Sequence, residues 1–468
     1  MDSSTWKGLW RRAAPVAVFA LLSVFVLLLY TSWSRPLLWD EFVYFAPAGL
    51  PGTRDAMQAM YETATNLNQG VTGVFFMVDF WLLKIFGAQS WALRFPGLVA
   101  GAALLTYSAV FLVARRLSLW ALPAVPIVFA TQELVMRYVG EARTYLPLAA
   151  ASIGVLAYYS LSREQRATWW GRAVGWSAVL MGVLFHPYFA LYWLALGTFA
   201  YVVWGRHMHW KLRSFANAPL VVVGGVIYIS LGIATWLRGR ATAEVDPFNF
   251  LPGPLPIEIL AQNGYFLIGS PWSVVGLMGV GAALIAMSVA GRVSITSVWR
   301  AVRAPVVLAL LAFLLALAIS ASTIAADFWI FPRQWIASTA IIALAGLWGA
   351  AEWWRVSTAG NDGPPKASAV GAVGVVVMTI SIVALASPVV VDRIALDRSW
   401  RDRTPSASDT RAELAANLEA GRELSDPDWV GFAQANVDSG GPVWSEFGEY
   451  YTGRDWTAFV LTDGSANQ

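Results

Sequence analysis

The chain has 468 residues, of which 57% are hydrophobic and 13% are charged. Soluble domains carry about one quarter charged residues, so the composition favours a polytopic membrane protein over any soluble class. The absence of cysteine excludes disulfides, thiolate metal sites and cysteine nucleophiles. Charge is divided unevenly: residues 1–391 hold 25 basic and 15 acidic residues, a net +10, whereas residues 392–468 hold 7 and 14, a net −7. Two regions of different chemistry therefore meet near residue 391.

The first region is dominated by apolar runs of about 18–20 residues, the length at which a helix crosses the hydrocarbon layer. We expect eleven or twelve membrane elements, so the predicted fold is an all-α polytopic membrane domain over residues 1–391. The predicted spans are 13–30, 71–87, 95–114, 119–136, 144–161, 172–204 (one long or two short helices), 217–236, 272–290, 305–325, 334–351 and 368–389.

Basic residues predict the orientation of these spans, because Lys and Arg are enriched in cytoplasmic loops. Lys7, Arg11 and Arg12 precede the first span, which indicates a cytoplasmic N-terminus on an uncleaved anchor, with a cleaved signal peptide as the alternative. The extracytoplasmic segments are then 31–70, 237–270, 326–333 and the tail. Arg115 and Arg116 form one of several basic clusters that predict cytoplasmic loops, so 71–114 must cross the membrane an odd number of times although it contains two apolar segments. One of them, with 71–87 as the candidate, would be re-entrant or interfacial.

The segments between and after the spans have ordinary mixed composition. We expect the acidic tail, 392–468, to be a small α/β extracytoplasmic domain. It would either rest on the membrane domain or be the start of a domain that is larger in related proteins. Short interfacial helices are predicted at 54–68 and 256–267, a mobile Gly/Pro linker at 356–367, a tail helix at 409–423, and tail strands at 442–447 and 457–462.

Adjacent carboxylates, Asp40 and Glu41, lie about ten residues beyond the first span, between Trp39 and Phe42. Ionised groups beside a membrane are costly and are functional candidates by default. A carboxylate at this surface could take a proton from a hydroxyl group. The alternative is a helix N-cap or a solvated pair in a loop.

Further charged and aromatic candidates lie at predicted span ends. Arg side chains suit bidentate contacts with phosphate. The structural alternatives to a functional role for these segments are an interfacial anchor, a charged turn or a snorkelling side chain. A lone intramembrane His is usually hydrogen-bonded in the interior. The candidates are Glu141, Arg143 and Tyr145 in EARTY, Asp327 and Arg333 in ADFWIFPRQW, His186 and Tyr188 in FHPYF, and Arg94 in WALRFPG.

The sequence lacks the motifs of several functional classes. The sequence contains no Walker A pattern, so an ATP-driven pump is not indicated. It has no H-E-x-x-H pattern, only three His, and no Ser nucleophile elbow.

The order of the remaining motifs resembles the GT-C superfamily of membrane glycosyltransferases, in the branch of protein O-mannosyltransferases and bacterial aminoarabinose transferases. The resemblance covers about residues 10–390, and an extracytoplasmic C-terminal domain is common in that branch. One element departs: relatives carry H-P-P-L or K-P-P-L where this chain reads NLNQGVTGVFF at 66–76. The matching motifs are Asp40–Glu41, then Gly87 with Arg94, Phe95, Pro96 and Gly97, then Glu141–Tyr145, His186 with Tyr188, and Pro332, Arg333 and Trp335.

This resemblance implies an enzyme that moves a hexose or pentose from a polyprenyl-phosphate donor to an acceptor hydroxyl on the outer face, with inversion. It implies that Asp40 is the general base and that Glu41 helps position the acceptor. Arg143, Arg333 and Arg94 would stabilise the leaving phosphate, and the loop 237–270 would cap the lipid groove. Glu141, Tyr145, His186, Tyr188 and Asp327 would line the substrate pocket. No metal or other cofactor is implied.

The acceptor is left open as a protein, lipid or polysaccharide; no nucleic-acid partner is indicated. A composition rich in Ala, Gly, Arg and Trp but poor in Lys suggests a GC-rich bacterium, hence a bacterial plasma membrane. A transporter or flippase of lipid-linked sugars is an alternative, although such proteins carry midplane charges and paired repeats. A non-catalytic envelope-assembly protein is another, and it would not require Asp40, Arg143 and Arg333 to converge.

Overall fold

The computed structural model describes the central helices of the chain. The described residues are 54, 74–86, 90–115, 121–139, 141–186, 188–205, 264–269, 295–325 and 332–359. The predicted spans 13–30, 217–236, 272–290 and 368–389, the tail 392–468, and most of 31–70 and 237–270 lie outside them.

Within the described ranges every regular element is helical. Three helical stretches, at Trp91–Ala114, Thr296–Ser322 and Pro332–Trp353, are long and apolar enough to cross a membrane. The helical, membrane-type part of the prediction is confirmed over these residues. The elements are α4 (Val74–Phe86), α5 (Ser90–Ala114), α6 (Ala121–Ala130), α7 (Glu133–Tyr138), α8 (Tyr145–Ser160), α9 (Arg163–Ala167), α10 (Trp169–Phe185), α11 (Phe189–Trp204), η4 (Gly264–Leu267), α15 (Ile295–Ala325), η5 (Pro332–Trp335) and α16 (Ile336–Ala359).

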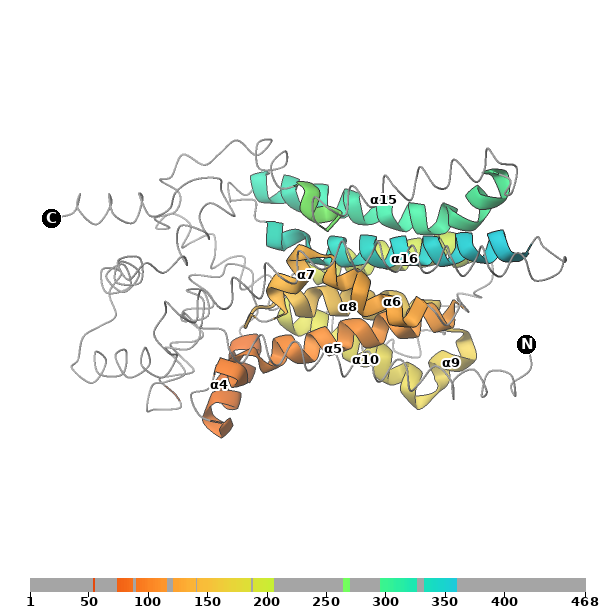
Figure 1. Cartoon of the computed structure of the whole chain (residues 1–468). Coiled ribbons are helices and arrows are strands. Elements are labelled where there is room, and N and C mark those ends of the chain that lie inside the picture. The colour runs from red at the N-terminus through yellow and green to blue at the C-terminus, as the bar shows by residue number, and fades with distance from the viewer. Residues whose placement is uncertain are drawn as a thin grey trace, which may run out of the picture.

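Helix α8 forms the centre of the bundle and packs against α5, α10, α11 and α16 (Figure 1). Its sequence is apolar on every face and rich in Ala, as expected for a helix that is surrounded by protein. Gly154 lets its neighbours approach closely, because an added Cβ would lie 2.8 Å from the Tyr107 ring of α5. The Tyr107 hydroxyl is hydrogen-bonded to Ser177 of α10 at 2.6 Å. The buried helix thus ties α5 and α10 together.

Helices α15 and α16 lie side by side along one edge of the bundle (Figure 1). The Trp335 indole donates a hydrogen bond to Ser320 of α15 at 3.0 Å, and the Ser338 and Tyr192 hydroxyls are 2.8 Å apart. Thr339 donates to the Phe266 carbonyl oxygen, which fixes η4 against α16. These bonds hold η4, η5 and α11 around the start of α16.

The predicted span 119–136 is wrong, because two short helices, α6 and α7, replace it. Gln132 between them has an extended backbone, and the N–H of Glu133 donates to the Gly269 carbonyl oxygen at 3.1 Å. Gly269 has φ +124°, and an added Cβ would lie 2.7 Å from the Gln132 amide. The break thus falls on the polar residues Thr131, Gln132 and Glu133, and a hydrogen bond from a distant segment holds it.

Other boundaries differ in ways that hydropathy does not resolve. Helix α4 has 13 residues and extends about 20 Å, too short to cross, and it leaves the bundle at one end (Figure 1). This agrees with the re-entrant or interfacial alternative for 71–87. The segment 172–204 is two helices, α10 and α11. Helix α15 starts ten residues before the predicted 305, and α16 continues to Ala359, so the predicted linker 356–367 begins as helix.

Candidate functional site

The EARTY motif forms a buried turn that leads into α8. Glu141 and Arg143 are 4% and 5% exposed. The Glu141 N–H donates to the Tyr138 carbonyl oxygen at 3.3 Å, and the Arg143 N–H donates to the Glu141 carbonyl oxygen at 2.9 Å. Tyr145 then begins the helix. Local hydrogen bonds thus fix two charged residues where the central helix starts.

The RFPG motif of α5 passes directly against this turn. A Cβ added to Gly97 would lie 2.8 Å from the Glu141 carbonyl oxygen, so only glycine allows this approach. Arg94, one turn earlier, is fully buried. A snorkelling Arg94, with its charged end in water, is therefore wrong. Two motifs that are more than forty residues apart meet here.

Aromatic rings gather around Tyr145, and we call Tyr138, Tyr145, His186, Tyr188 and Arg333 the Tyr145 cluster. The Tyr145 ring centroid lies 5.4 Å from that of Tyr138 and 5.4 Å from that of His186. The His186 and Tyr188 centroids are 5.1 Å apart. The Arg333 guanidinium carbon is 5.5 Å from the Tyr145 centroid, a cation–π contact. The predicted FHPYF, EARTY and PRQW residues thus lie together.

The His186 ring has a defined hydrogen-bonding pattern. It is 4% exposed at the break between α10 and α11, and its Nδ1 accepts the Tyr188 N–H at 3.2 Å. Because Nδ1 accepts, the neutral ring carries its proton on Nε2. This agrees with an interior, hydrogen-bonded His. The ring also presents an Nε2–H donor beside Tyr145.

Arg137 belongs to this site, although the motif comparison did not include it. Its Nε lies 3.9 Å from Glu141 Oε1, and both side chains are buried. The signal was present in the sequence as an i,i+4 pair of opposite charges in RYVGE. In the structure this pair joins α7 to the turn that holds Arg143.

Tyr265 of η4 interacts electrostatically with two side chains of α7, Glu133 and Arg137. Burial, with a contribution from the Glu133 carboxylate, raises the pKa of the Tyr265 hydroxyl to about 12 despite the opposing effect of Arg137. The Tyr265 hydroxyl therefore stays protonated at physiological pH. The loop that interrupts the apolar run also lies beside the site.

Three predicted site residues, Asp40, Glu41 and Asp327, lie outside the described residues. Among the residues that the structure does describe, no three His, Asp or Glu side chains group as metal ligands. A second buried carboxylate, Asp79 of α4, is fully enclosed. It lies on the helix next to α5, which carries Arg94.

Comparison with known proteins gives structural neighbours only. No family model matches the chain, and no curated protein matches it. The crystal structure of ArnT from Cupriavidus metallidurans in the apo state is similar at TM-score 0.46 and 15% identity, covering 88% of this chain and 72% of that one. The structure of the same ArnT bound to undecaprenyl phosphate is similar at TM-score 0.42 and 14% identity, covering 89% and 73%.

Proposed function

We propose that this protein is an integral membrane glycosyltransferase of the GT-C type that uses a polyprenyl-phosphate sugar as donor. One observation carries the proposal: EARTY, FHPYF and PRQW meet around Tyr145, with RFPG packed on the preceding turn. A structural anchor would need only one such residue at a span end. Four motifs from separate helices at one end of a bundle support a site for surface chemistry on a bound substrate.

The leaving group of this reaction is a lipid phosphate, which needs nearby positive charge but no general acid. We assign this role to Arg143 and Arg333, with Arg94 in support. Arg143 lies two residues before Tyr145, and Arg333 rests over the Tyr145 ring. A guanidinium that stacks on an aromatic face keeps its N–H donors at the edge, where they can form bidentate bonds to phosphate oxygens.

Asp40 is proposed as the general base. Its carboxylate takes the proton of the acceptor hydroxyl, and the hydroxyl oxygen attacks the anomeric carbon from the side opposite the phosphate. The bond from that carbon to the phosphate oxygen breaks, and the lipid phosphate leaves with the electron pair. One displacement inverts the anomeric configuration. Glu41 positions the acceptor.

The remaining candidates would line the sugar pocket. The Nε2–H of His186 is a neutral donor suited to a sugar oxygen, and Tyr145 and Tyr188 offer ring faces. Glu141 and Asp327 would accept hydrogen bonds from sugar hydroxyls. The reaction requires no metal or other cofactor, and it takes place on the outer face of a bacterial plasma membrane. The acceptor is a protein, lipid or polysaccharide.

A transfer assay with the purified full-length protein tests this function. The protein is incubated with a panel of polyprenyl-phosphate sugars and candidate acceptors, and the products are identified by mass spectrometry. Arg333→Gln should lower transfer about 100-fold or more, since a charged hydrogen bond to the leaving group is lost. Arg303→Gln, at an exposed position of α15, is the matched control and should retain wild-type transfer. Folded protein that transfers none of the sugars would contradict the proposal.

A further inference from the structure

A second group of charged and aromatic side chains lies at the other end of α5. Gly97 and Arg115 are separated by about 27 Å along the helix, close to the thickness of a bilayer core. The Arg115 guanidinium carbon lies 5.0 Å from the Trp204 ring centroid and 5.1 Å from that of Trp348. These two rings come from α11 and α16, and their centroids are 6.2 Å apart. Three helices thus place one cation against two indoles, far from the Tyr145 cluster.

Two buried donors in this group lack an acceptor. Arg115 Nε and Trp204 Nε1 are enclosed, and neither donates a hydrogen bond within the described part of the chain. Trp204 as a whole is 7% exposed. Buried N–H groups in native proteins nearly always have partners, and each exception calls for an explanation. Here two exceptions lie beside one another.

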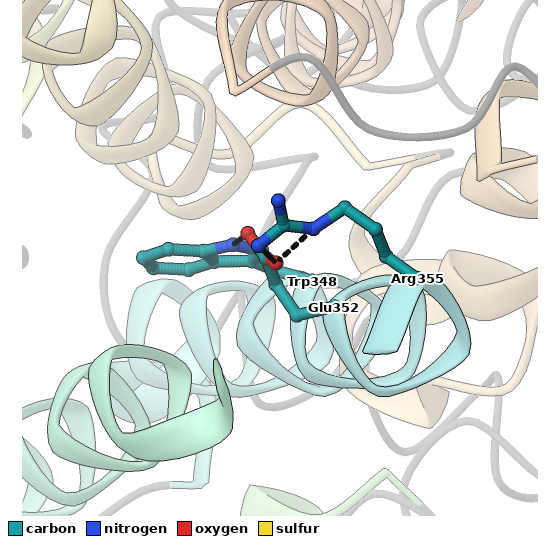
Figure 2. A network of polar contacts seen from close by, with 3 residues as sticks. All are labelled: Trp348, Glu352 and Arg355. Atoms are coloured by element: carbon teal, nitrogen blue, oxygen red, sulfur yellow. Dashed lines mark hydrogen bonds and ion pairs between the residues drawn. The ribbon is translucent and has the colours of Figure 1, made fainter. Parts of the chain in front are cut away.

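The nearby carboxylate does not supply the missing acceptor. Figure 2 shows Glu352 held by its own helix: its Oε1 accepts the Trp348 indole N–H at 3.3 Å, and its Oε2 accepts from Arg355 Nε at 2.9 Å. Arg355 Nη2 also lies 2.7 Å from Oε2. Among the described residues no hydrogen bond or ion pair joins Glu352 to Arg115. The carboxylate therefore acts on Arg115 only through its field.

The chemistry of the group selects an anion. Burial lowers the pKa of the Arg115 guanidinium, Glu352 raises it and Arg355 lowers it, so a bound anion would favour the charged form. The guanidinium edge suits the paired oxygens of a phosphate, and the Trp204 indole, whose ring centroid lies 5.0 Å from the guanidinium carbon, adds a neutral N–H donor. Arg355, with a side chain that is 64% exposed, adds positive charge at the rim.

We propose that Arg115 and Trp204 form a phosphate-binding site at the end of the bundle opposite the Tyr145 cluster. The phosphate comes either from a membrane lipid headgroup or from free phosphate. The site is separate from the proposed transfer site and does not depend on it.

Native mass spectrometry of the full-length protein in detergent tests this site. The protein is titrated with phosphatidylglycerol, with diacylglycerol of the same acyl chains, and with inorganic phosphate. Phosphatidylglycerol should bind the wild type and diacylglycerol should not, if a lipid is the source. Binding of inorganic phosphate alone supports the site and assigns free phosphate as the source.

Three variants distinguish specific binding at this site from non-specific binding elsewhere on the protein. Arg115→Gln should weaken binding about 10- to 100-fold, and Trp204→Phe, which removes the N–H but keeps a ring, about tenfold. Arg303→Gln removes an exposed charge of α15 and should bind as the wild type does. If Arg115→Gln fails to fold, Trp204→Phe alone decides. Wild-type binding by folded Trp204→Phe, equal binding of diacylglycerol, or no binding of any phosphate by the wild type would overturn the proposal.

Discussion

Gly97→Ala is the substitution through which the packing of α5 on the EARTY turn can be tested most sharply. The new Cβ would lie 2.8 Å from the Glu141 carbonyl oxygen, whereas ordinary contact begins at 3.4 Å. The backbone must therefore move by about 0.6 Å, because a carbonyl cannot rotate away as a flexible side chain can. Such overpacking costs about 1–3 kcal/mol of stability. Arg143 lies two residues beyond the displaced carbonyl, so we expect transfer to fall about tenfold, given that a 1 Å misplacement can cost about 100-fold.

The assay is the initial rate of sugar transfer, measured together with the thermal unfolding midpoint in detergent. Gly346→Ala is the matched control, because a Cβ at this position of α16 meets nothing within 4 Å. Gly346→Ala should keep the wild-type rate and raise the midpoint slightly, since alanine favours the helix by about 0.5–1 kcal/mol. A Gly97→Ala protein with the wild-type rate and midpoint would refute the close contact between Gly97 and the Glu141 carbonyl oxygen.

Three further substitutions give distinct readouts. Tyr145→Leu should lower transfer about tenfold by removing the ring beneath Arg333, whereas Tyr145→Phe should stay within a few-fold; equal rates for the two would show that the ring is not needed. Gly269→Ala should lower the unfolding midpoint, since its φ of +124° strains any L side chain by about 1–3 kcal/mol, whereas Gly264→Ala, whose Cβ meets nothing within 4 Å, should not. Because burial raises the native pKa of Tyr265 to about 12, wild-type stability should fall between pH 10 and 12 more steeply than that of Tyr265→Phe; parallel alkaline unfolding curves would contradict this.

Helix positions and motif residues could be predicted from the sequence, because local patterns determine them. Apolar runs located the centres of α5, α8, α15 and α16, with individual helix ends off by up to ten residues. The motif order predicted Tyr145, His186, Tyr188 and Arg333 as site residues, and the structure brings them together. The break at Gln132 escaped because its cause, a hydrogen bond from Glu133 to Gly269, joins residues far apart in the chain. A hydropathy average over a long window does not resolve the three polar residues, Thr131, Gln132 and Glu133, at that point.

The same limit applies at the other end of the bundle. Arg115 read as one of several cytoplasmic loop charges, because nothing near it in sequence distinguishes it from Arg116. Only the packing of α11 and α16 places Trp204 and Trp348 against its guanidinium. Glu352 and Arg355 form an i,i+3 ion pair near the end of α16, which continues into the predicted linker. Tertiary contacts with α11 and α16, rather than local sequence, make Arg115 distinctive.

The central claim is that a sugar leaves a polyprenyl phosphate and joins an acceptor in one displacement. Its most direct test is a time course with purified protein, in which released polyprenyl phosphate and glycosylated acceptor are measured together. Wild-type protein should produce the two in equal amounts, and folded Asp40→Asn should produce neither at a comparable rate. Full transfer by Asp40→Asn would contradict the assignment of the base. Unchanged donor, carried across a vesicle membrane without release of lipid phosphate, would contradict the transferase and support a flippase instead.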